Sequence, residues 1–220
     1  AWESLDFFMF FNIYEKRVCL NFDTPSFFIL KTISYLCSRN TIQTQMSTFN
    51  QMQQIKRQFF ALRNGIIADT IRKAGGDYKI IFGLNIPQLR DIAQSIGKNK
   101  ELSLMLFDND TTRESLLLAP MIYPVEDLTL QDAIAMAFKT KTYETADTLS
   151  HALLRHFNNA KELCSELIHS DNIMAKYTGL RLFLNLQLPL TDEVVSICNS
   201  EIENDSSLKY ISRQVLDSQI

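Results

Sequence analysis

Two side chains in the second half of the sequence have the types and the spacing that could support chemistry. Tyr143 and Asp147 stand four residues apart in a segment with helical periodicity, which places them on one face of a helix. A carboxylate held near a developing positive charge lowers the barrier to forming it, and an aromatic face can hold a cationic edge. Asp147 also stands four residues before His151, so an ordinary solvated pair is the alternative that spacing alone leaves open.

The cysteines and the remaining histidines show no pattern that would hold a metal ion. The sequence contains no C-x-x-C and no histidine at a metal-ligand spacing from a cysteine. His156 and His169 have no partner pattern, so we expect them at the surface or in the core. We expect free thiols in a reducing compartment and no metal. The four cysteines are Cys19, Cys37, Cys164 and Cys198.

The composition limits the kinds of partner. The formal net charge is −3, and from Met46 onward 18 basic residues face 21 acidic ones. Binding to nucleic acid would therefore need a local basic patch, and no basic groove is visible in the sequence. No apolar run reaches the ~18 residues of a membrane span. No signal peptide pattern opens the chain, so we expect no membrane partner.

Residues 1–45 differ from the rest of the chain. They contain seven phenylalanines and the one tryptophan, Trp2, without a clean helical or strand period. Met46 then opens a stretch that is typical of a protein start. We hypothesise that 1–45 is an atypical extension, translated from beyond the true start and not native, that precedes a helical-repeat domain at 46–220. A helical N-terminal cap is the alternative.

Helical periodicity and capping residues run through the rest of the chain. We expect a capping box between Thr111 and Glu114, a cap at Asp171, and a bend or break at Pro120. No strand alternation appears. Helix pairs of about 30–37 residues favour an all-α array of HEAT-like two-helix repeats forming a curved solenoid, with a compact irregular helical domain as the alternative. The predicted helices cover 51–73, 87–96, 98–107, 111–122, 129–138, 142–157, 160–169, 173–186, a segment from 191, and 206–220.

Three segments carry a resemblance to a known family. They read Gly-Leu-Asn-Ile-Pro-Gln-Leu-Arg-Asp-Ile-Ala at 83–93, Glu-Leu-Ser-Leu at 101–104 and Glu-Ser-Leu-Leu-Leu-Ala-Pro-Met-Ile at 114–122. Together they resemble the DNA alkylation repair family, the AlkD-like DNA glycosylases built from HEAT-like repeats. The resemblance covers about residues 50–200. Its motifs are mostly packing motifs, so they are more specific for the fold than for the activity.

The resemblance also implies site residues. The family's catalytic segment has an aromatic residue, usually tryptophan, four positions before an aspartate, and Tyr143 and Asp147 stand in those places. Asp147 is then the catalytic carboxylate and Tyr143 a substrate-binding aromatic. Lys176 stands where the family often has an arginine pair, which implies a phosphate-binding cation. Weaker candidates for phosphate contacts are Arg90, Lys139 and Lys141.

The implied function is a DNA repair glycosylase without metal or cofactor, located in the bacterial cytosol or nucleoid. Its partner would be double-stranded DNA with alkylated bases of the 3-methyladenine or 7-methylguanine type. Such bases are cationic and leave readily, so a carboxylate that stabilises the oxocarbenium-like sugar would suffice. A non-catalytic repeat module that binds a protein or DNA is the alternative. The sequence leaves the oligomeric state open.

Overall fold

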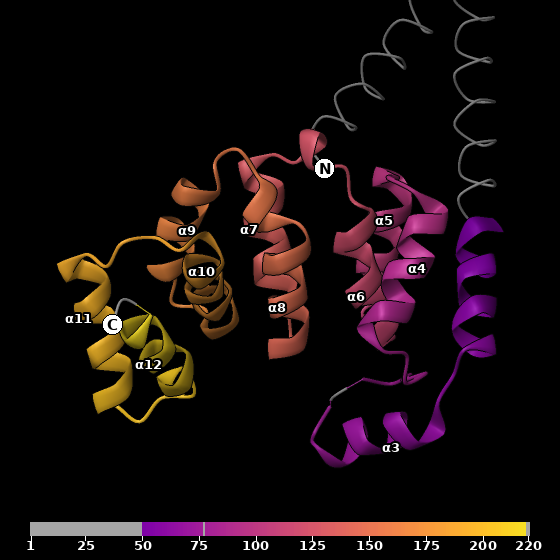
Figure 1. Ribbon diagram of the computed structural model, residues 1–220, viewed down its shortest axis with the longest axis horizontal. Helices are drawn as coiled ribbons and strands as arrows, with labels where there is room; N and C mark the ends of the chain where they lie inside the picture. The colour runs from indigo at the N-terminus through magenta and orange to yellow at the C-terminus, as the bar shows by residue number, and fades with distance from the viewer. Residues whose placement is uncertain (1–49, 77, 219–220) are drawn as a thin grey trace, which may run out of the picture. The chain divides into compact units, whose positions relative to one another are not determined.

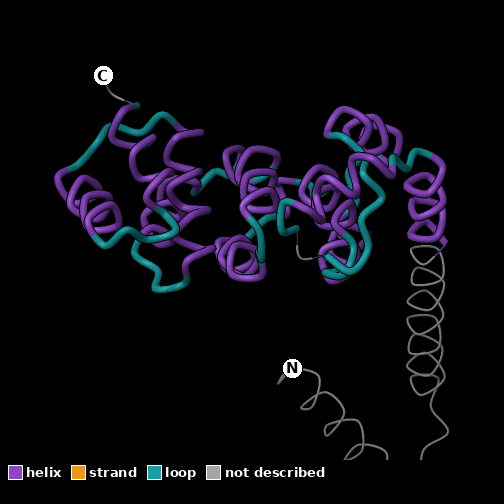
Figure 2. Tube along the Cα trace, turned by 90° about the horizontal axis from the view of Figure 1, so that it is seen from below, coloured by secondary structure: helices purple, strands orange, loops and turns teal. Residues whose placement is uncertain are grey.

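The computed structural model describes residues 50–76 and 78–218, and that part of the chain is helical (Figure 1). Residues Thr48–Ile220 form one compact unit. Figure 2 shows helices joined by loops, and within the described residues the single isolated β-bridge pairs Ile80 with Thr112. The prediction of an all-α fold is confirmed. The hypothesis about residues 1–45 falls outside the described residues.

The helices follow one another with short connections. No described helix is long and apolar enough to pass through a bilayer. The first helical segment of the described residues covers 50–61. The elements after it are α3 (Gly65–Lys73), α4 (Ile86–Ile96), α5 (Lys100–Asp108), α6 (Arg113–Ile122), η1 (Val125–Asp127), α7 (Leu130–Lys139), α8 (Tyr143–Ala152), η2 (Leu154–His156), α9 (Ala160–Ile168), α10 (Ile173–Leu186), α11 (Asp192–Glu203) and α12 (Lys209–Asp217).

Successive helices pack as neighbouring pairs, as Figure 1 shows for α5 with α6, α9 with α10, and α11 with α12. Helix α8 also packs on α6 and on α10, so the pairs share one continuous apolar core. The approach of α10 to α9 is close at Gly179, where an added Cβ would lie 2.8 Å from the backbone nitrogen of Ile168. This stacking of helix pairs is the HEAT-like arrangement that the sequence predicts.

The prediction of one helix over 51–73 is wrong, because the chain breaks before Gly65. The side chain of Asn64 accepts hydrogen bonds from the backbone of Ile66 (3.1 Å) and Ile67 (3.2 Å), and so caps a new helix, α3. The backbone N–H of Asn64 donates to the carbonyl of Phe82 at 2.8 Å. The hydrogen bond between Asn64 and Phe82 therefore stabilises a break between two helices. The apolar periodicity of 51–73 gives no sign of this break.

The prediction of a capping box between Thr111 and Glu114 is also wrong. Thr112 precedes α6 without a side-chain cap, and the carboxylate of Glu114 is fully buried instead. It accepts hydrogen bonds from the backbone N–H groups of Phe82 (3.1 Å) and Gly83 (2.9 Å) and from Nη1 of Arg113 (2.9 Å). A buried carboxylate needs such partners, and here they tie the loop before α4 to the start of α6.

Two further helix limits differ from the predicted ones. Asn172, not Asp171, caps α10, because its side-chain oxygen accepts from the backbone of Met174 and Ala175 at 3.0 Å. Pro120 does not break its helix, since α6 continues through it to Ile122.

The described cysteines, Cys164 and Cys198, are free and buried, and burial raises the pKa of the Cys164 thiol to about 12.

Candidate functional site

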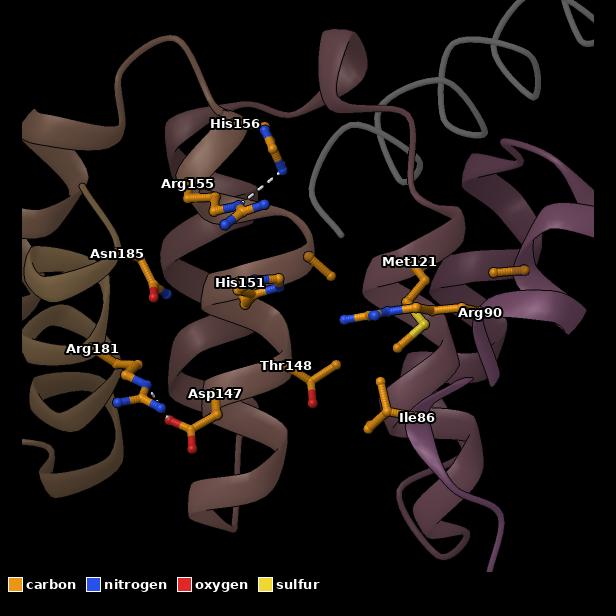
Figure 3. Close-up of a pocket in the computed structure, with 12 residues that line it drawn as sticks. Ile86, Arg90, Met121, Asp147, Thr148, His151, Arg155, His156, Arg181 and Asn185 are labelled. Atoms are coloured by element: carbon orange, nitrogen blue, oxygen red, sulfur yellow. Dashed lines mark hydrogen bonds and ion pairs between the residues drawn. The ribbon is translucent and has the colours of Figure 1, made fainter. Parts of the chain in front are cut away.

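A cleft of about 680 Å³ lies between α4 and α6 on one side and α8, η2 and α10 on the other (Figure 3). Among the described residues that line it, Asp147 is the only carboxylate. Arginines and histidines supply most of its other polar side chains. The lining consists of Ile86, Arg90, Ala93, Met121, Asp147, Thr148, His151, Ala152, Arg155, His156, Arg181 and Asn185.

The start of α8 is anchored to the preceding part of the fold. The hydroxyl of Thr142 caps the helix by accepting from the backbone of Thr145 at 3.3 Å, and it also shares a 2.5 Å hydrogen bond with Oη of Tyr78. Two residues later, Glu144 accepts from Nε of Arg113 at 2.8 Å. Through Arg113, the network around Glu114 therefore sets the position of the helix that carries Asp147.

Helix α8 ends earlier than the predicted limit at 157. It stops at Ala152, and a 3₁₀ turn, η2, follows at Leu154–His156. The turn buries both Leu153 and Leu154 in the core. As a result Arg155 and His156 line the cleft together with His151, which lies on the last turn of α8 (Figure 3).

Asp147 is held from α10 by two side chains. Its Oδ1 accepts a hydrogen bond from Oη of Tyr177 at 3.0 Å and forms an ion pair with Nε of Arg181, also at 3.0 Å. Burial raises the pKa of the Asp147 carboxyl, while Arg181 and the Tyr177 hydroxyl oppose that rise. Neither contact uses Oδ2. The carboxylate is therefore fixed in orientation while one oxygen takes no part in these two contacts.

Tyr143 is the first residue of α8 and does not line the cleft itself. It is 44% exposed, and its ring packs against that of Tyr177 with centroids 4.6 Å apart. Its hydroxyl donates to the carbonyl of Ser207 at 3.4 Å. Tyr143 and Asp147 thus lie one turn apart on α8 and share Tyr177 as a neighbour.

Lys176 lies on α10 but is not one of the residues that line the cleft. Its Nζ is 2.9 Å from Oε1 of Glu201, and the two side chains are only 21% and 17% exposed. Of the weaker candidates, Arg90 lines the cleft, whereas Lys139 pairs with Asp108 at 3.0 Å on the exposed surface. Lys141 pairs with Asp110 in the same way.

Sequence reasoning missed most of the cations in the cleft. The side chain that accompanies Asp147 is Arg181, five positions after Lys176. A signal for it exists, because Tyr177 and Arg181 are four residues apart in a predicted helix and must share a face. Arg155 and His156 carried no such signal, since they depend on the turn that ends α8 early.

The family model described as DNA alkylation repair enzyme matches residues 55–208, which is most of the chain. The chain belongs to this family. The match extends well beyond the three motifs at 83–122 that carry the resemblance. No curated protein matches the chain in sequence.

A solved structure supports the fold of this DNA alkylation repair family member. It is described as "A new family of proteins related to the HEAT-like repeat DNA glycosylases with affinity for branched DNA structures". The match has a TM-score of 0.62 at 17% sequence identity and covers 76% of this chain and 74% of that chain. At this identity the similarity concerns the fold, and it agrees with the HEAT-like repeats described above.

Proposed function

We propose that this member of the DNA alkylation repair family is a DNA glycosylase that removes cationic alkylated purines of the 3-methyladenine or 7-methylguanine type. One observation carries the proposal. Asp147 is the only carboxylate among the described residues of a cleft that three arginines also line, and it is oriented by Tyr177 and Arg181. A negative charge in that position is complementary to a sugar that becomes positive.

Hydrolysis of the bond to a cationic purine needs few catalytic groups from the protein. An alkylated purine carries a positive charge, so it leaves with the electrons of the C1′–N bond as a neutral base. The deoxyribose then becomes oxocarbenium-like, and a preorganised carboxylate lowers the free energy of that transition state. Water adds to C1′ and gives up a proton, completing the hydrolysis. Asp147 acts here in its ionised form. Because Tyr177 and Arg181 engage Oδ1, we assign Oδ2 to the sugar or the water.

The cations suit the phosphates on either side of the lesion. Arg90, Arg155 and Arg181 line the cleft from three different elements, so a strand lying along it would meet positive charge at several points. We also propose that Tyr143, which is partly exposed, contacts the substrate. Lys176 would have to exchange Glu201 for a phosphate. Arg181 is also ion-paired, with Asp147, but it lines the cleft and Lys176 does not, so Lys176 is the weaker candidate for this phosphate role.

Release of 7-methylguanine and 3-methyladenine from alkylated duplex DNA tests this function. We expect release by the wild type and a large loss with Asp147→Asn, which keeps the shape of the side chain and removes its charge. Equal release by both proteins would remove Asp147 from the mechanism. A wild type that binds the duplex but releases no base would refute the glycosylase function.

A second function, DNA binding without cleavage, has an observation in its favour. Oδ1 of Asp147 is already engaged by Tyr177 and Arg181, as it would be in a purely structural ion pair. The similar solved structure is described as having affinity for branched DNA structures. Under this reading the protein binds a four-way junction more tightly than a duplex of the same length, and Asp147→Asn leaves that preference unchanged.

A further inference from the structure

One end of the cleft gathers positive charge that no described acidic side chain neutralises. Arg155 and His156 of η2 lie beside His151 of α8, and Arg90 of α4 points toward them from the opposite wall (Figure 3). In the described part of the chain, neither Arg90 nor His151 has an ion-pair partner. The one contact within the group is the hydrogen bond that Nε of Arg155 donates to Nε2 of His156 at 3.1 Å.

The charged groups around the two histidines are nearly all cations. Partial desolvation lowers the pKa of His151, and the positive charges of Arg155, Arg90, His156 and Arg181 lower it further. His156 is affected in the same direction by desolvation, Arg155 and Lys98. Asp147, on the same helix as His151, is turned toward Tyr177 and Arg181. Met121, which α6 contributes to the cleft, is uncharged.

The hydrogen bond between Arg155 and His156 fits a neutral histidine in the free protein. Nε2 can accept from Nε of Arg155 only when it carries no proton. Clustered cations without a counter-ion repel one another, and repulsion keeps both rings neutral near pH 7. An anion bound among them would remove the repulsion and favour protonation.

We propose that Arg90, His151, Arg155 and His156 form a phosphodiester-binding site whose occupancy is coupled to protonation of both histidines. The site rests on the proposed function in one respect, that its phosphodiester belongs to a bound DNA strand. On binding, His156 gains a proton at Nε2, releases Nε of Arg155, and both groups then donate to the phosphate. His151 gains a proton on the same wall of the cleft, and Arg90 meets the anion from the opposite wall.

The coupling sets the direction of the pH dependence. A phosphodiester keeps one negative charge between pH 5.5 and 8, so any change in that range comes from the protein. The histidine pKa values are below the ordinary value of about 6.5 in the free protein and rise on binding, so binding takes up protons. Affinity therefore rises as the pH falls. A shift of one pKa unit at one histidine changes the affinity about tenfold.

The test measures the affinity for an unmodified duplex from pH 5.5 to 8 at constant ionic strength. The Asp147→Asn variant serves as the background, which removes cleavage and the titration of that carboxyl. We expect binding to weaken at least about tenfold as the pH rises through this range. His151→Gln with His156→Gln should reduce the change to about twofold or less, with the weak affinity of high pH retained throughout.

Two further variants guard against misfolding and general effects. His151→Lys with His156→Lys carries permanent charge and should bind tightly at every pH. His169→Gln changes the third histidine of the chain, which lies outside the cleft and pairs with Glu193 at 2.9 Å. It should keep the full pH dependence. A pH dependence that is unchanged in the two double variants, or that disappears in His169→Gln, would overturn the proposal.

A second measurement separates the site from the proposed function. Sulfate keeps its charge over this pH range, and NMR titration of the three histidine rings in sulfate against chloride needs no DNA. Sulfate should raise the pKa of His151 and His156 and leave that of His169 unchanged. If it does so while no DNA binds, the anion site stands and a free anion replaces DNA as its ligand. Unchanged pKa values at His151 and His156 would refute the site itself.

Discussion

The hydroxyl of Tyr177 on α10 donates a hydrogen bond to Oδ1 of Asp147 on α8, with 3.0 Å between the two oxygens. The same tyrosine ring packs against Tyr143, so one residue contacts both members of the aromatic and carboxylate pair. Burial and the negative charge of Asp147 raise the pKa of the Tyr177 hydroxyl. Tyr177 therefore remains a donor across the pH range in which the protein would act, and we assign it as a positioning residue.

Tyr177→Phe should shift the acid side of the pH profile for base release to higher pH. The hydrogen bond favours the ionised form of Asp147, so its removal lets the pKa of that carboxyl rise further. We expect a shift of about one pH unit or less, because the carboxylate is partly exposed. The phenyl ring keeps the packing against Tyr143. Tyr210→Phe, which changes an exposed tyrosine, is the control, and identical profiles for both variants would contradict the assignment.

Arg181→Gln should weaken binding of unmodified duplex DNA and lower its dependence on salt. Arg181 lines the cleft beside Asp147, and a cation that neutralises one phosphate contributes about one unit to the salt slope. Affinity measured at several salt concentrations gives that slope. Lys161→Gln removes the same charge from α9, outside the lining of the cleft, and should leave it unchanged. Equal slopes for the two variants would place the phosphate elsewhere.

Gly83→Ala should destabilise the protein much more than Gly97→Ala. Both glycines have left-handed backbones, with φ of 81° and 76°, so an alanine costs about 1 kcal/mol at either position from conformation alone. At Gly83 the added Cβ would also lie 2.2 Å from the carbonyl oxygen of Asn64, whereas at Gly97 it meets nothing within 4 Å. Urea unfolding of both variants measures the difference, and equal losses would contradict the close approach of Gly83 to Asn64.

Glu114→Gln should lower the free energy of unfolding by about 3 kcal/mol. The carboxylate is fully buried and accepts from Phe82, Gly83 and Arg113. A glutamine amide has one acceptor atom, so it leaves a backbone donor unpaired and the Arg113 charge less well compensated. Urea unfolding checks this against Glu126→Gln, an exposed control that should change stability little. A similar loss of stability in both variants would mean that the hydrogen bonds of Glu114 contribute little to the free energy of unfolding.

Much of the fold could be read from local pattern. The caps at Asn64 and Asn172 are local signals that were available, but the apolar period of 51–73 and the acidic residue at 171 pointed to other limits. The buried role of Glu114 could not be predicted from its neighbours in the sequence. A Thr followed three positions later by a Glu satisfies the local rule for a capping box, and only the loop at Phe82 and Gly83 shows that the carboxylate is needed elsewhere.

The sequence by itself determined the helical repeats, the family and the position of Asp147, because helix periodicity and packing motifs act between residues close in the chain. The tertiary structure alone decided which charges surround that carboxylate. In the folded protein Lys176 forms an ion pair with Glu201, and Arg181 forms one with Asp147. Arg90 lies across the cleft from His151. These neighbours lie on different helices, so their distances depend on how the helices pack and not on spacing along the chain.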